Sequence, residues 1–130
     1  MKFIKTIAIV ALIFAAGNAS AQSVADKWPA MKAFHEVMSR TFHPAEEGNF
    51  EPLKTYSESL MNKAMDLTKE VPAQYKTKSI MDSVSRLQEK TKEVNKLVVG
   101  KGPDSSLLKA ITEAHDIFHE IVGMCSGEKH

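Results

Sequence analysis

Histidines are the residues in this sequence whose type and spacing most clearly suit chemistry. His115 and His119 lie four residues apart, in a segment whose apolar residues recur at helical spacing. Because one helical turn takes 3.6 residues, two such side chains project from the same side of the helix. Two imidazoles at this spacing can bind one metal ion, so the pair is a candidate metal site.

A second pair, His35 and His43, lies toward the opposite end of the sequence. His35 falls at the edge of the apolar stripe of a predicted helix. Pro44 disfavours helical geometry at the residue before it, so we predict that this helix ends near Thr41–Phe42 and that His43 lies in a turn. If the first and last helices are antiparallel neighbours, His35 lies level with residue 118, and a fold-back at Pro44 brings His43 near. All four histidines are then candidate ligands of one ion.

Four amphipathic helices are predicted to position these histidines. They span about residues 24–41, 52–70, 73–99 and 104–124, and no segment alternates with the period of a strand. Prolines and glycines separate them, at Pro44, Pro52, Pro72 and Gly100–Pro103. Amphipathic helices with short connections predict an all-α fold, an antiparallel up-down-up-down four-helix bundle.

The apolar stripes of these helices predict which side chains face the core. In the second helix they are Leu53, Tyr56, Leu60, Ala64 and Leu67, and in the last helix Leu108, Ile111, His115, Phe118, Val122 and Cys125. His115 is thus predicted to face the core, where a single histidine is more often a hydrogen-bonded packing residue than a ligand. Several buried imidazoles without a metal would each need a polar partner, whereas one ion satisfies them together.

The first 21 residues have the pattern of a secretory signal peptide. Lys2 and Lys5 precede an apolar run over Ile7–Ala16, which is followed by the small-residue sequence Ala19-Ser20-Ala21. We predict cleavage after Ala21 and a periplasmic or secreted location. Residues 22–130 then form one bundle domain of 109 residues, long enough to bury a core.

The charge balance and the single cysteine limit the classes of partner. Without Lys2 and Lys5 there are 15 basic and 16 acidic residues, so no basic excess indicates nucleic-acid binding. No apolar run after the signal peptide predicts a membrane span. Cys125 has no partner for an internal disulfide, and we expect a small buried side chain there. A homodimer, including one crosslinked through Cys125, is left open.

Histidine ligands suit Zn²⁺ first and Cu²⁺ second, and a contribution from Met38 would favour copper. One alternative is a b-type haem held between Met38 and His115, because the sequence lacks the C-x-x-C-H motif of attached haem. Another alternative is a metal-free structural or interaction module. The sequence contains no H-E-x-x-H motif, no nucleophile with an evident base and no phosphate-binding glycine loop, so we predict metal binding rather than catalysis.

Two stretches resemble the paired motifs of a family of small exported bacterial helical bundles for which no activity is established. They are the stretch from His35 to Asn49, with Thr-Phe-His-Pro-Ala-Glu-Glu-Gly-Asn at its end, and the stretch His115-Asp-Ile-Phe-His-Glu-Ile121. In architecture the chain is also similar to the cytochrome b562 and cytochrome c′ bundles, without a haem-attachment motif. The resemblance implies export, an antiparallel bundle, and a histidine site of His35, His43, His115 and His119 between the first and last helices.

Overall fold

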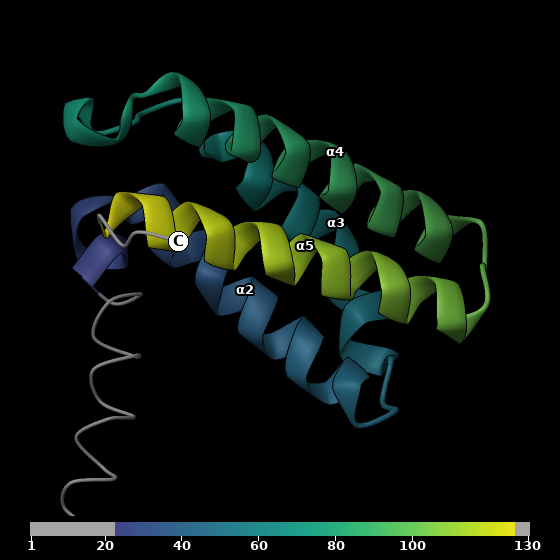
Figure 1. The fold of residues 1–130 in the computed structure, drawn as a ribbon. Coiled ribbons are helices and arrows are strands. Elements are labelled where there is room, and N and C mark those ends of the chain that lie inside the picture. Colours follow the sequence, from purple (N-terminus) through teal and green to yellow (C-terminus); the bar gives the residue numbers. More distant parts are fainter. Residues whose placement is uncertain (1–22, 127–130) are drawn as a thin grey trace, which may run out of the picture.

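The computed structural model describes residues 23–126, so the predicted signal peptide over residues 1–21 lies outside the described residues. Within residues 23–126 the chain forms helices and short connections without a strand, which confirms the all-α prediction. A helical turn over residues 23–27 precedes the main elements. These are α2 (Pro29–Glu46), α3 (Glu51–Asp66), the 3₁₀ helix η1 (Ala73–Tyr75), α4 (Lys78–Val99) and α5 (Asp104–Cys125) (Figure 1).

Helices that follow one another in the chain pack side by side, and α2 also contacts α5. The contact between α2 and α5 is less extensive than that of any consecutive pair. Figure 1 shows α2 crossing α5 at an angle, whereas α4 and α5 lie alongside one another. None of the helices in the described part of the chain combines the length and apolar character that crossing a bilayer needs.

Hydrogen bonds between neighbouring helices record their relative direction. Between α3 and α4, the Ser57 hydroxyl donates to Asn95 Oδ1 at 3.0 Å and the Gln88 amide donates to the Ala64 carbonyl at 3.0 Å. Residue numbers therefore fall on α4 as they rise on α3. Between α4 and α5, Lys90 pairs with Glu113 and Arg86 pairs with Glu120. Residue numbers on α5 therefore rise as those on α4 fall.

The core is built from the apolar faces of all four long helices. Its largest fully buried side chains are Trp28, Phe34, Phe118, Met31, Met38, Leu53, Leu60, Leu67, Leu87, Leu107, Ile111 and Ile121. On α3 the predicted inward position of Tyr56 is wrong, because its side chain is 46% exposed. Ser57 takes the inward place instead, at helical spacing from Leu53 and Leu60, and its hydrogen bond to Asn95 satisfies the buried hydroxyl.

The first long helix does not end before Pro44, as the sequence predicted, but continues through it to Glu46. A proline inside a helix removes one intrahelical hydrogen bond and its ring crowds the carbonyl four residues earlier, here that of Arg40, so this continuation is locally unfavourable. Two side chains of the last turn of α2 are buried, Phe42 at 5% and Ala45 at 1% exposure. Their burial outweighs the unfavourable local preference, so His43 lies on a helix and not in a fold-back loop.

Two other boundaries differ from the predicted ones. α3 ends at Asp66 rather than near residue 70, and α4 begins at Lys78, with η1 before it. Thr77 supplies the N-terminal cap of α4, because its side-chain oxygen accepts a hydrogen bond from the Ile80 amide at 3.2 Å.

Removing this cap should destabilise the protein measurably. We expect Thr77→Ala to lower the free energy of unfolding by about 1 kcal/mol, since the Ile80 amide loses its acceptor. Thr77→Ser keeps the hydroxyl and should stay within about 0.3 kcal/mol of the wild type. Urea denaturation followed by circular dichroism measures both values. Equal stabilities of the Ala and Ser variants would contradict a capping role for Thr77.

Candidate metal centre at the contact of α2 and α5

The two histidines of α5 lie beside its apolar stripe rather than within it. The buried residues of α5 are Leu107, Ala110, Ile111, Ala114, Ile117, Phe118, Ile121, Val122 and Gly123. The stripe is thus centred on Ala114 and Phe118, and His115 is half-buried at its edge. The prediction that His115 faces the core is therefore only partly right. His119, one turn later, is exposed.

His115 and His119 form a close pair. Their Nε2 atoms are 3.1 Å apart, and the rings are nearly perpendicular, with an interplanar angle of 77° and centres 4.4 Å apart. In metal-free protein one ring donates its N–H to the other ring's lone pair. Two nitrogen ligands of a tetrahedral zinc ion lie about 3.3 Å apart, given Zn–N bonds of about 2.05 Å. The pair therefore already has the separation that chelation of one ion requires.

His43 approaches this pair from α2. Its ring centre is 6.3 Å from that of His115, and its Nδ1 lies 3.4 Å from Glu46 Oε1. Two imidazoles bound to one tetrahedral ion have ring centres about 5 Å apart. His43 therefore lies about 1 Å too far away to share an ion with His115 as it stands.

His35 has a different surrounding from the other three histidines. Its half-buried ring stacks on Phe118, with ring centres 5.1 Å apart and an interplanar angle of 17°. Phe118 also meets the ring of His119 at 5.5 Å. The structure thus places His43 and His119 near His115, and His35, stacked on Phe118, lies close enough to His119 and His43 for both to lower its pKa.

Within residues 23–126, no group of three or more His, Cys, Asp or Glu side chains has an arrangement that could hold a metal ion. The reason lies in the distances above. His115 and His119 form a close pair, whereas the ring of His43 lies farther from His115 and meets Glu46 through its Nδ1 atom. The described geometry is that of a histidine pair with a third histidine nearby.

Burial and neighbouring imidazoles favour the neutral form of His115 and His35. Burial first, and then the nearby His119 and His43, lower the pKa of His115 to about 4, against the opposing charges of Asp116 and Glu46. The pKa of His35 is also lowered, mainly by burial and then by His119 and His43. A neutral imidazole keeps the lone pair that a metal ligand needs.

Phe42 is a residue of this site that the sequence analysis did not identify. Its ring stacks on that of His115, with centres 3.8 Å apart and an interplanar angle of 11°. This contact fixes the plane of the imidazole. The helical spacing of Met38, Phe42 and Ala45 would have revealed it, had the helix been extended past Pro44.

The haem alternative finds little room at this contact. Met38 is 1% exposed within the core. Phe34 and Phe118 pack against one another there, and Phe42 covers the face of His115. A haem between Met38 and His115 would have to displace these aromatic rings.

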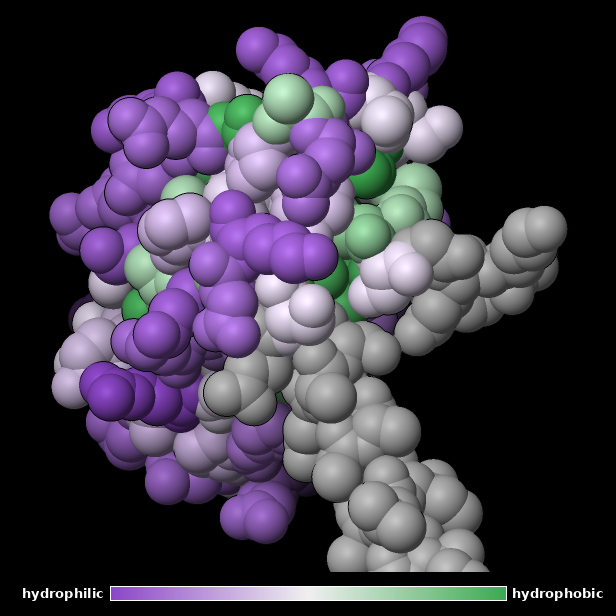
Figure 2. Space-filling view, turned by 90° about the vertical axis from the view of Figure 1, so that its left-hand side faces the viewer, coloured by the Kyte–Doolittle hydropathy of each residue, from purple (hydrophilic) through white to green (hydrophobic). Residues whose placement is uncertain are grey.

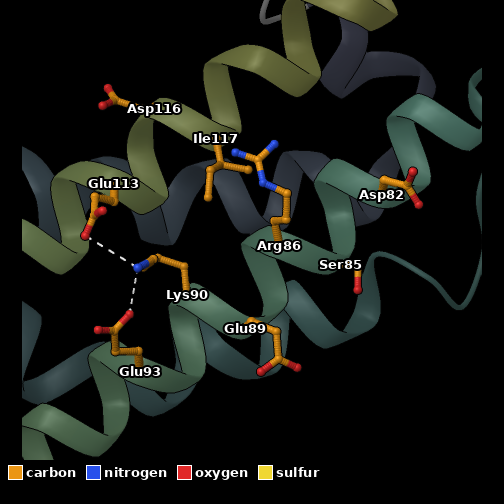
Figure 3. Close-up of a pocket in the computed structure, with 9 residues that line it drawn as sticks. All are labelled: Asp82, Ser85, Arg86, Glu89, Lys90, Glu93, Glu113, Asp116 and Ile117. Carbon is orange, nitrogen blue, oxygen red and sulfur yellow. Dashed lines mark hydrogen bonds and ion pairs between the residues drawn. The ribbon is translucent and has the colours of Figure 1, made fainter.

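A groove with a volume of about 890 Å³ lies between α4 and α5 (Figure 3). Charged side chains line most of it, and Lys90 bridges Glu93 at 2.7 Å and Glu113 at 3.4 Å. Ile117 is its apolar residue, and Asp116 lies on its rim. The histidines are not among its lining residues. Five of its lining side chains are carboxylates and two, Arg86 and Lys90, are basic, so the lining is acidic overall.

Figure 2 shows the end of the molecule near which α2 begins and α5 ends. Hydrophilic side chains dominate this face, with hydrophobic ones scattered among them. Cys125 is half-buried, and burial raises the pKa of its thiol to about 11. The thiol is therefore protonated at neutral pH and a poor ligand or nucleophile.

Comparison with known proteins does not assign this site. No protein family model, no curated protein and no solved structure matches the chain. The resemblance to exported bacterial bundles therefore rests on the two sequence stretches alone. What the site does has to be argued from its own geometry.

The lowered pKa of His115 predicts a loss of stability in acid, with a chelator present. The folded protein holds this ring neutral down to a pKa of about 4, whereas the unfolded chain protonates it near 6.5. Stability is therefore complete above pH 6.5 and falls as the pH is lowered toward 4. The full shift corresponds to about 3 kcal/mol, and solvent screening at this half-buried position reduces the expected loss to about 1–2 kcal/mol.

His115→Phe is the matched variant, because phenylalanine keeps the stacking on Phe42 without titrating. We expect the wild type to lose about 1–2 kcal/mol more than this variant between pH 7 and pH 4. Urea denaturation at each pH gives the two curves. Parallel curves would show that His115 has an ordinary pKa.

Proposed function

We propose that this chain is an exported protein that binds a transition metal, with zinc first and copper second. The helices would form an antiparallel up-down-up-down bundle, and His43, His115 and His119 would be the ligands at the contact of α2 and α5. The observation that carries the proposal is the 3.1 Å separation of the Nε2 atoms of His115 and His119, opposite His43. Its role would be metal binding, buffering or sensing rather than catalysis.

A bound ion would replace the hydrogen bond between His115 and His119 with shared coordination. Three neutral imidazoles supply the nitrogen donors that Zn²⁺ and Cu²⁺ prefer, and a water or carboxylate can complete a tetrahedral shell. Coordination would also tie α2 to α5, the helices whose contact is less extensive than that of consecutive pairs. His35, stacked on Phe118, would support the ring of His119 and contribute less to binding than the three ligands.

A metal-free interaction module is the second candidate function. The hydrogen bond between His115 and His119 favours it, because each ring then satisfies a polar atom of the other without an ion. Metal analysis separates the two candidates directly, since only the first binds zinc with a defined stoichiometry.

Zinc titration of the protein, prepared without a histidine tag, tests the proposed function. We expect one zinc ion per chain, and a loss of affinity of at least about 100-fold in His115→Ala or His119→Ala, since each removes a ligand of the close pair. His35→Ala should lower the affinity less than about tenfold. Calorimetry or competition with a chromophoric chelator measures the dissociation constants. Unchanged affinity in both α5 variants would exclude this site.

Bound zinc should also stabilise the fold, because the unfolded chain has no preformed site. At a free zinc concentration about 100 times the dissociation constant, the gain is about 2.7 kcal/mol, or an increase of about 10 °C in the melting temperature. Thermal unfolding by circular dichroism measures it, with His115→Ala as the control that shows little increase. A wild type that melts at the same temperature with and without zinc would speak against binding to the native state.

A further inference from the structure

We propose that Glu46 is the positioning residue of this site, the carboxylate that holds the Nδ1 side of His43 so that its Nε2 can bind the metal. The inference rests on the proposed function. It adds to the proposed site a residue outside the four histidines. It also assigns metal binding to Nε2 of His43, the ring nitrogen that does not meet the carboxylate.

The contact itself supplies the first argument. His43 Nδ1 lies 3.4 Å from Glu46 Oε1, three residues apart on the same face of the last turn of α2. An ionised carboxylate only accepts hydrogen bonds, so the proton of a neutral imidazole in this contact lies on Nδ1. The lone pair then lies on Nε2, which is the nitrogen available for a metal.

The last turn of α2, which carries His43 and Glu46, is held in place by the buried side chains on its opposite face. Phe42 and Ala45, which alternate with His43 and Glu46 along the turn, are 5% and 1% exposed. Gly48, at φ 91°, ends the helix, and its amide donates to the Ala45 carbonyl at 3.0 Å. The two functional side chains are therefore presented from a fixed backbone, and only their own rotamers need to adjust.

Position along α2 distinguishes Glu46 from the other carboxylates near the histidines. Its charge acts on His115 as well as on His43, so it lies near both helices of the site. Asp116 lines the groove on the α4 side of α5. Glu36 acts on His35, which packs against Phe118. Glu46 is thus the carboxylate with a contact to a proposed ligand and a position facing the pair on α5.

A carboxylate in this position has a known chemical effect. It fixes the tautomer and orientation of the imidazole and makes the ligating nitrogen more basic, and its removal typically costs 10–100-fold in metal affinity. Glu46 would therefore act through His43 and would not itself need to touch the ion.

Zinc affinities of four variants test the inference, all measured on the protein without a histidine tag. Glu46→Ala removes the acceptor and should weaken zinc binding about 10–100-fold. Glu46→Gln keeps an oxygen acceptor and should recover part of that loss. Glu47→Ala and Glu47→Gln are the matched controls, because Glu47 carries the same charge one residue later and is exposed. Both should bind zinc within about twofold of the wild type, since a lone exposed charge contributes little.

A measurement without metal separates this inference from the proposed function. Nitrogen-15 NMR of the His43 ring should show the proton on Nδ1 in the wild type and in Glu47→Ala, and a shift toward Nε2 in Glu46→Ala. Equal zinc affinities of Glu46→Ala and Glu47→Ala, or an unchanged His43 tautomer in Glu46→Ala, would overturn the role of Glu46. If the wild type binds no zinc, the proposed function and the metal-positioning role both fail, whatever the tautomer shows.

Discussion

The aromatic packing between α2 and α5 is the constraint on which the histidine arrangement depends. The two helices have a less extensive contact than consecutive pairs, and rings make up much of it, with Phe42 against His115 and Phe118 against His35. Stacked rings prefer a defined separation and plane. They therefore fix not only that the helices touch but also the orientation of the imidazoles. Aliphatic side chains would bring the same helices together without setting that orientation.

The packing that orients the imidazoles also sets their protonation. Burial, together with the neighbouring His119 and His43, lowers the pKa of His115 to about 4. The ring of His115 is then neutral near pH 7 and offers one N–H and one lone pair. The 3.1 Å gap between His115 and His119 fits a shared proton and is also close to that between two ligands of one ion. The proposed metal site and its metal-free alternative thus arise from the same geometry. They differ in whether a metal ion or a proton lies between the nitrogens of His115 and His119.

The last turn of α2 shows how tertiary packing overrides a local preference. Pro44 disfavours helix at His43, and the sequence therefore predicted a turn there. Burial of Phe42 and Ala45 stabilises the helical conformation more than the lost hydrogen bond destabilises it. As a result His43 and Glu46 share one helical face, which the predicted fold-back loop would not have produced. The difference between a loop and a helix at one residue decides which carboxylate meets which imidazole.

The sequence by itself determined the helical composition, the approximate span of each long helix and the pairing of His115 with His119, because these follow from local periodicity. It also predicted that histidines from the first and last helices approach one another, and His43 does lie near His115. Only the tertiary structure decided that His35 stacks on Phe118, that Ser57 replaces Tyr56 in the core and that Glu46 contacts His43. Such features depend on the rotation of each helix about its axis and on contacts between residues far apart in the sequence. A one-residue change in register alters both, and the local sequence pattern does not encode them.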